Sequence, residues 1–87
     1  SSKKEKIYIS QDIVKIEKGI TKAEYLWEEF RTFTSFQIQK DINKKIRLSF
    51  RSKGEDVFVG DFLNEDDKNK LKEEVGLIIQ ELNSQIP

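Results

Sequence analysis

The spacing of apolar residues changes once along this chain, and that change constrains the fold more than any other feature. Up to residue 59, apolar side chains tend to recur at every second position, as in Ile46, Leu48 and Phe50. From residue 65 onward they recur at intervals of three and four, as in Leu71 and Val75. The first spacing is typical of a strand with one buried face, and the second of an amphipathic helix. The sequence therefore predicts an α+β fold in which antiparallel strands precede one C-terminal helix.

Several short strands are expected before that helix, separated by polar turns. The segments are a hairpin around Gln11-Asp12, a long strand at 30–39, a regular strand at 45–51, a turn at 52–56 and a short strand at 57–59. Alternation between polar and apolar residues is the basis for each strand. The exception is 57–59, which is apolar on both faces and is typical of an inner strand or of one end of a barrel.

The final helix carries a start signal and one apolar stripe. Asn64 is a typical N-cap, and the acidic residues 65–67 fill the first turn, where the helix dipole favours negative charge. The stripe expected to anchor the helix on the sheet consists of Leu71, Val75, Ile78 and Leu82, with Ile79 and Ile86 beside it. Leu77 lies on the opposite, polar side of the helix.

The segment 21–33 fits two structures. Thr21 and Glu24 form a capping-box pattern that indicates a helix. Tyr25 and Trp27 share one face if the segment is instead a third strand. The residues alone leave both alternatives open. In either structure Trp27 is expected to be a core anchor, because one tryptophan supplies much of the apolar surface of a small core.

The composition excludes several kinds of chemistry. The 87 residues include no His, Cys or Met, so the chain has no Ser–His or Cys–His nucleophile pair, no Cys/His zinc site and no disulfide. We therefore expect no catalytic residue, no metal and no cofactor in a protein that is not an enzyme. The acidic residues 61 and 65–67 lack the ordered spacing of a calcium loop, and predict a charged helix start.

Charge is balanced over the chain but not along it. The 16 basic and 16 acidic side chains give a net charge of 0, although residues 1–53 carry +6 and residues 54–87 carry −6. A neutral chain does not favour specific or indiscriminate nucleic-acid binding. Residues 1–5 are expected to be a basic tail ahead of a single domain at 6–87. The alternative is that this tail is the cytoplasmic flank of a membrane anchor preceding Ser1, because lysine-rich flanks mark the inner side of a membrane.

Two groups of surface residues are candidate sites. The candidate anion-binding residues are Arg31, Lys45, Arg47 and Arg51, which are expected to share the solvent face of two adjacent strands. Such a face binds phosphates, or else it is a solvated face paired with nearby acids. The candidates for contact with a protein partner, or for self-association, are Phe33 and Leu77, because both break the polar pattern of their elements.

Two sets of residues carry a resemblance to known families. A hairpin, the step Trp27-Glu28-Glu29-Phe30, a meander and a C-terminal helix together resemble the bacterial pleckstrin-homology-like domains. Residues 48–54 (LSFRSKG) and 59–63 (VGDFL) are similar to the soluble C-terminal domain of a family of small bacterial proteins with two transmembrane helices. The resemblance implies a partly open β-barrel of about seven short strands capped by one helix. It also favours the strand alternative for 21–33.

The resemblance implies a function as well as a fold. It implies a non-enzymatic domain on the cytoplasmic face of the bacterial inner membrane, beside an anchor. Together with the missing catalytic residues, the basic start of the chain and the expected exposure of Phe33 and Leu77, it leads us to expect a protein-interaction or scaffold domain. The alternative is an anion-binding module that uses the four basic residues to bind a lipid headgroup or nucleic acid. Lipid-binding pleckstrin-homology domains use basic residues in a long first hairpin loop. The Gln11-Asp12 turn is short and acidic, so headgroup binding by that route is not expected.

Overall fold

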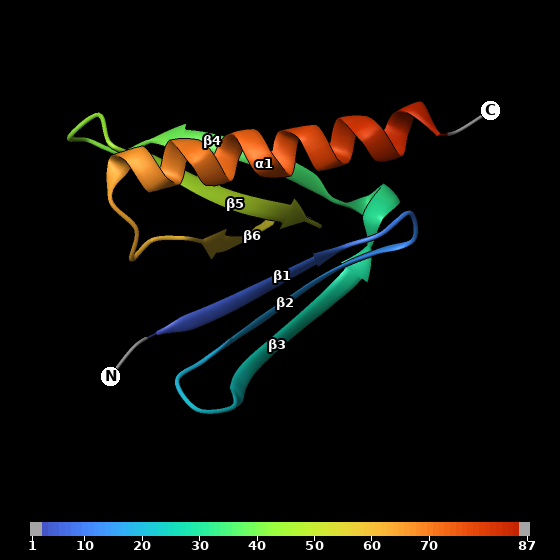
Figure 1. Cartoon of the computed structure of the whole chain (residues 1–87), viewed down its shortest axis with the longest axis horizontal. Coiled ribbons are helices and arrows are strands. Elements are labelled where there is room, and N and C mark those ends of the chain that lie inside the picture. Colours follow the sequence, from blue (N-terminus) through green and yellow to red (C-terminus); the bar gives the residue numbers. More distant parts are fainter. Residues whose placement is uncertain (1–2, 86–87) are drawn as a thin grey trace.

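Two three-stranded antiparallel sheets and one long helix make up the computed structural model, which describes residues 3–85. The first sheet has the order β1 (Lys4–Ile9), β2 (Ile13–Gly19) and β3 (Ala23–Phe30). The second has the order β4 (Ser35–Lys40), β5 (Ile46–Ser52) and β6 (Glu55–Val59). A 3-10 turn, η1 (Arg31–Phe33), joins the sheets, and α1 (Glu65–Ser84) follows β6. The helix extends along one side of both sheets (Figure 1).

The predicted α+β architecture, with open antiparallel sheets and one C-terminal helix, is confirmed. The sheets do not close into a barrel, and the described residues contain six strands rather than about seven. The strand alternative for 21–33 is also correct, because β3 pairs with β2 along its length and places Trp27 opposite Ile16. Trp27 is half-buried and packs against the core.

The prediction of one continuous strand at 30–39 is wrong. The chain leaves the first sheet at Phe30, turns through η1, and enters the second sheet at Ser35. The Thr34 backbone N–H and hydroxyl both donate to the Arg31 carbonyl, at 3.0 and 2.8 Å, and this closes the turn. Alternation continues through the segment in the sequence, but the backbone bends because it must cross from one sheet to the other.

The tight turns follow the sequence more closely. The Ser10 N–H donates to the Ile13 carbonyl at 2.9 Å, which encloses Gln11-Asp12 as a two-residue hairpin turn. The strands β5 and β6 extend into the expected turn at 52–56, and only Lys53 and Gly54 connect them. Both have positive φ, at 55° and 78°, which is the conformation of a type I′ hairpin turn.

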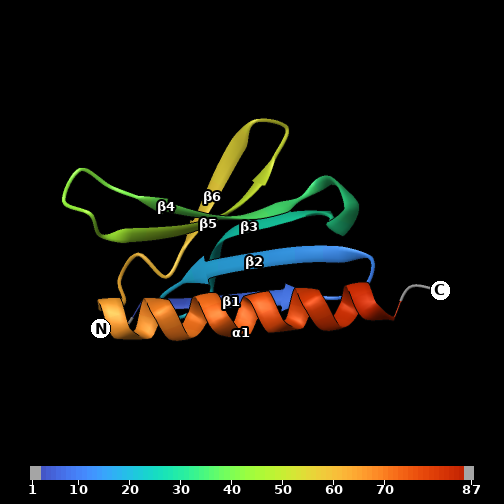
Figure 2. The same cartoon turned by 90° about the horizontal axis from the view of Figure 1, so that it is seen from above.

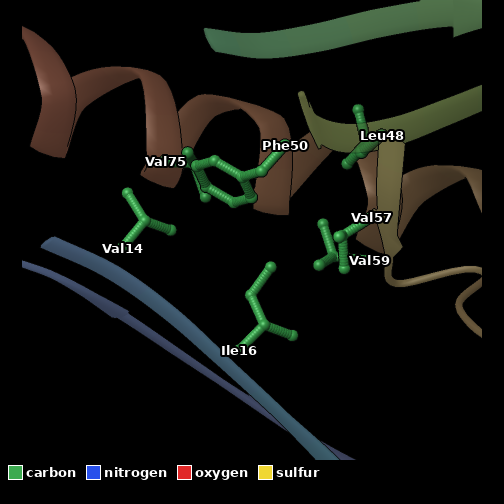
Figure 3. Packing of buried hydrophobic residues seen from close by; sticks show 7 residues of the cluster. All are labelled: Val14, Ile16, Leu48, Phe50, Val57, Val59 and Val75. Carbon is green, nitrogen blue, oxygen red and sulfur yellow. The ribbon is translucent and has the colours of Figure 1, made fainter. Parts of the chain in front are cut away.

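The core lies where the two sheets and the helix meet (Figure 3). Its fully buried apolar residues are Val14 and Ile16 from β2, Leu48 and Phe50 from β5, Val57 and Val59 from β6, and Val75 from α1. The segment 57–59, expected as an inner strand or a barrel end, forms most of an edge strand, β6. Its outward Phe58 is covered by Arg47, whose guanidinium carbon lies 3.6 Å from the ring centroid.

The helix rests on the core through a stripe slightly different from the expected one. Val75 is buried, and Leu71 and Leu82 are half-buried. Ile78 is instead 44% exposed, and Ile79 packs against the core in its place. At 100° per residue, Ile79 lies about 40° from Val75 around the helix and Ile78 about 60° on the other side. The expected neighbour Ile86 lies outside the described residues.

The start of the chain is more ordered than a tail of residues 1–5 implies. Strand β1 begins at Lys4, which is paired with Gly19 of β2. Residues 1 and 2 lie outside the described part of the chain. The single domain therefore begins at least two residues before the expected boundary at residue 6.

Candidate functional site

A groove lies between strand β1 and helix α1, and we name it the β1–α1 groove. Its volume is about 540 Å³, which is in the range of small-ligand and peptide-binding clefts. The residues that line it are Ile7, Tyr8, Ile9, Ser10, Ile13, Leu71, Glu74, Val75 and Ile78. Most of these side chains are apolar, and Glu74 is the charged one among them. Figure 2 shows that β1 is the strand of the first sheet that lies nearest α1.

The β1 side of the groove carries free backbone groups. Strand β1 is at the edge of its sheet and pairs with β2 alone among the described strands. The Ser10–Ile13 hydrogen bond sets the alternation, so Lys6 and Tyr8 also direct their backbone groups toward β2. The N–H and C=O groups of Glu5, Ile7 and Ile9 therefore point away from β2, toward the open edge. Such groups are a ready template for another strand.

The α1 side of the groove is a well-anchored wall. The Asn64 side chain accepts a hydrogen bond from the Asp67 N–H at 2.8 Å and caps the helix. The other end is tied to the β1–β2 turn, because the Gln11 amide donates to the Leu82 carbonyl at 2.7 Å. Arg31 adds a bond to the Asn83 side chain at 2.8 Å. The wall is thus held at both ends while Leu71 and Ile78 face the groove.

The far end of β1 is joined to the second sheet by polar contacts. The Glu5 carboxylate accepts from the Gly60 N–H at 2.8 Å and lies 3.8 Å from the Lys18 ammonium. Lys18 also donates to the Phe58 carbonyl at 2.5 Å. These contacts tie Glu5 of β1 and Lys18 of β2 to β6 and to Gly60, which follows it.

The four candidate anion-binding residues do not converge. Arg47 pairs with Asp61 at 2.6 Å, and Arg51 pairs with Asp56 at 3.0 Å. Arg31 lies in η1 rather than on a shared strand face, and donates to the Gln11 carbonyl and side chain and to Asn83. Lys45 lies in the β4–β5 turn. The expected shared basic face is therefore divided, because the 30–39 strand breaks at Arg31 and nearby acids pair with the two β5 arginines.

The ion pairs also change the acidity of their carboxyl groups. The hydrogen bond from Arg51 lowers the pKa of Asp56, and the Ser49 hydroxyl adds to this effect. The hydrogen bond from Arg47 lowers the pKa of Asp61 in the same way. Both carboxylates are thus held in the charged state, and they neutralise the arginines that face them.

Phe33 and Leu77, the candidates for partner contact, lie on separate elements. Phe33 is 60% exposed and makes an edge-to-face contact with Phe30, at 5.9 Å between ring centroids. Leu77 is 65% exposed and lies about 200° from Val75 around α1, on the solvent side. Phe33 therefore forms an exposed aromatic pair with Phe30, which is itself 61% exposed. Leu77 lies on a different element and is not part of that pair.

The acidic residues near the helix start do not form a metal site. Within residues 3–85, no group of three or more His, Cys, Asp or Glu side chains converges in a way that could hold a metal ion. Asp61 is bound to Arg47, and Glu65 lies 3.8 Å from Lys68. The sequence interpretation of residues 65–67 as a charged helix start agrees with their place in the first turn of α1.

The groove was not predicted from the sequence. The available signals were Ile7 and Ile9 on the first strand and Ile78 at the border of the helical stripe. Each of these residues could equally be buried in the core. The sequence pattern therefore did not show whether they line a groove or pack in the core. Only the distance between β1 and α1 makes that distinction.

Fold and site together define the class of protein: an α+β domain of two open sheets and one helix, with an apolar groove at a free strand edge. Residues 1–77 match the family described as Integral membrane protein (DUF2244), and the chain belongs to this family. The predicted relationship to membrane proteins is thereby confirmed at the level of the family. No curated protein and no solved structure matches the chain. Between residues 3 and 85, no helix has the length and apolar character needed to cross a membrane.

Proposed function

We propose that this chain is a non-catalytic protein-interaction domain of a membrane-anchored protein. The β1–α1 groove binds one extended segment of a partner protein. The observation that carries the proposal is the coincidence of free backbone groups on β1 with an apolar wall on α1. Strand addition at a sheet edge uses both features, because main-chain hydrogen bonds supply affinity and side-chain pockets supply specificity.

The dimensions of the groove favour a single segment over a folded domain. A volume of about 540 Å³ accommodates a few side chains. An added strand bonds to the outward groups of Ile7 and Ile9. Every second side chain of that strand then faces Leu71 and Ile78 on α1. An alternating apolar sequence is the expected partner chemistry.

The narrower assignment belongs to the same proposal. We take the domain to be pleckstrin-homology-like and to lie on the cytoplasmic face of the bacterial inner membrane. Two open antiparallel sheets followed by one C-terminal helix support the first part. Membership of an integral membrane protein family supports the location at a membrane.

The anion-binding alternative through Arg31, Lys45, Arg47 and Arg51 has less support. A phosphate at Arg47 or Arg51 must displace a carboxylate already in contact, at 2.6 or 3.0 Å. Arg31 is engaged by three acceptors from two other segments. These arginines stabilise loops and strand ends in the described structure.

The test is selection of short peptides on the purified chain, followed by mapping with ¹⁵N NMR. Ile78→Lys places a charge in the groove and is the disruptive variant. Leu77→Lys is the matched control, because it adds the same charge one residue away on the solvent side. Selected peptides with alternating apolar residues are expected to shift the amides of Ile7 and Ile9. Ile78→Lys is expected to weaken binding about tenfold or more, which corresponds to about 1.4 kcal/mol, and Leu77→Lys less than about twofold.

Two results contradict the proposal. One is that no peptide is selected above background. The other is that selected peptides shift amides around Phe33 or Leu77 and bind Ile78→Lys as well as the unchanged chain. Concentration-dependent sedimentation that is lost in Phe33→Ser or Leu77→Lys indicates self-association through those residues instead.

A further inference from the structure

Two turns with exposed isoleucine side chains lie at one end of the molecule. Figure 1 shows the β4–β5 turn, the start of β1 and the β2–β3 turn toward the same end of the long axis, the first beside the start of α1 and the last below β1. Ile20 in the first turn is 46% exposed, and Ile42 in the second is 96% exposed. Ile42 is the most exposed large apolar side chain of the described residues. A side chain so exposed makes no contribution to the core.

Lysines surround both isoleucines. We name the lysines of this region the basic end: Lys4, Lys6, Lys22, Lys40, Lys44 and Lys45. Ile20 lines a small cavity of about 140 Å³ with the first three and with Glu17 and Lys18, and Ile42 lies between Lys40 and Lys44 in sequence. All six lysines are exposed. Within residues 3–85 none of them has a carboxylate within ion-pair distance, whereas Lys18, Lys53, Lys68 and Lys70 do.

The β4–β5 turn is held in shape by its one acid. The Asp41 carboxylate accepts from the Asn43 N–H at 2.8 Å and from the Lys45 N–H at 3.0 Å. The Asp41 N–H also donates to the Lys45 carbonyl at 2.8 Å. Asp41 therefore satisfies backbone groups, and the turn presents Ile42 at its tip.

The acids that begin α1 lie at the same end of the molecule, and most of them have basic partners. Asp61 is paired with Arg47, Glu65 lies 3.8 Å from Lys68, and Asp67 lies 4.0 Å from Lys70. Among the acids here, Glu17, Glu24, Asp41 and Asp66 have no basic side chain within ion-pair distance in residues 3–85, and Glu17 lines the cavity beside Ile20. The six lysines of the basic end outnumber these four acids, so a modest excess of positive charge, of two, remains at this end.

We propose that the basic end binds the surface of an anionic lipid bilayer. The lysines contact lipid phosphates, while Ile42 and Ile20 enter the headgroup layer. Apolar residues flanked by lysines have this use in proteins that lie on membranes. Clustered lysines are attracted to anionic lipid, and the attraction is screened by salt. This surface is separate from the β1–α1 groove, so it stands whether or not the groove binds a peptide.

Vesicle binding by the purified chain tests the proposal. The vesicles contain phosphatidylcholine alone or with about 30% phosphatidylglycerol, at low ionic strength. We expect binding to the second kind only. Lys22→Ala/Lys45→Ala is expected to weaken it about tenfold. The control Lys15→Ala/Lys53→Ala has the same net charge and is expected to change it less than about twofold.

A second pair of variants tests the apolar contribution. Ile42→Ser is expected to weaken binding several-fold, and Leu77→Ser, on the solvent side of α1, is expected to have no effect. Equal binding to both kinds of vesicle, or an equal loss in the two lysine variants, overturns the proposal. Tighter binding to a single-stranded DNA oligonucleotide than to vesicles, through the same lysines, also overturns it.

Discussion

Phe50→Ala is the substitution expected to destabilise the domain most clearly. Phe50 is 1% exposed, and its ring centroid lies 5.1 Å from that of Phe36. Truncation of a buried phenylalanine costs about 3–5 kcal/mol, through lost burial and the cavity left behind. A domain of 87 residues has a free energy of unfolding of roughly 4–13 kcal/mol. The variant therefore loses a large share of its stability.

Urea unfolding followed by the fluorescence of Trp27 measures this loss. A slope of about 1 kcal/mol per molar urea, as for small domains, converts the cost into a midpoint lowered by about 3–5 M. Phe58→Ala is the matched control on the next strand, because Phe58 faces outward under Arg47. Its expected cost is about 1 kcal/mol, mainly from the cation–π contact. A cost for Phe50→Ala below about 1 kcal/mol, or equal to that of Phe58→Ala, refutes the core described here.

Three further predictions concern pH and backbone geometry. Hydrogen bonds from Arg51 and Arg47 lower the pKa values of Asp56 and Asp61 below the unfolded-state value of 3.8. The stability that these ion pairs contribute is therefore fully present above that value, and it is lost as pH falls through the lower pKa values of the folded state. The urea midpoint should be constant near neutral pH and fall below about pH 4, and the fall should be less steep in Asp56→Asn. A midpoint that stays constant below about pH 4 contradicts this prediction. Gly60→Ala should cost about 1–3 kcal/mol, because φ is 71° and a Cβ would lie 2.9 Å from Leu71 Cδ2, and an unchanged midpoint would show that the site relaxes. Gly76 lies in α1 with open space around it, so Gly76→Ala should raise the free energy of unfolding by about 0.5–1 kcal/mol. A lower urea midpoint for this variant would contradict the open space around Gly76.

Local sequence signals predicted the parts of the fold that depend on neighbouring residues. The Gln11-Asp12 turn and the Asn64 cap need only a few adjacent residues, and both are present as expected. The clean alternation at 45–51 likewise predicted β5, whose apolar residues Leu48 and Phe50 are fully buried in the core. The resemblance, rather than the pattern, separated strand from helix at β3.

Features that depend on distant residues were not predictable. Arg47 meets Asp61 only because the β6–α1 connection returns beside β5, so an arginine that looked free in the sequence is paired. The break at Arg31–Phe33 arises from the crossing between sheets, which the alternation does not reveal. Ile78 faces the groove because α1 rotates slightly relative to the expected stripe. Each case requires tertiary geometry.

Amide hydrogen exchange along β1 tests the central claim most directly, because the proposed function depends on a free strand edge. The isolated chain should protect the amides of Lys6 and Tyr8, which bond to β2. It should leave those of Glu5, Ile7 and Ile9 in fast exchange, and a bound extended peptide should slow them. Protection of Ile7 and Ile9 equal to that of Lys6 and Tyr8 in the isolated chain would contradict the account, because the edge would already be paired.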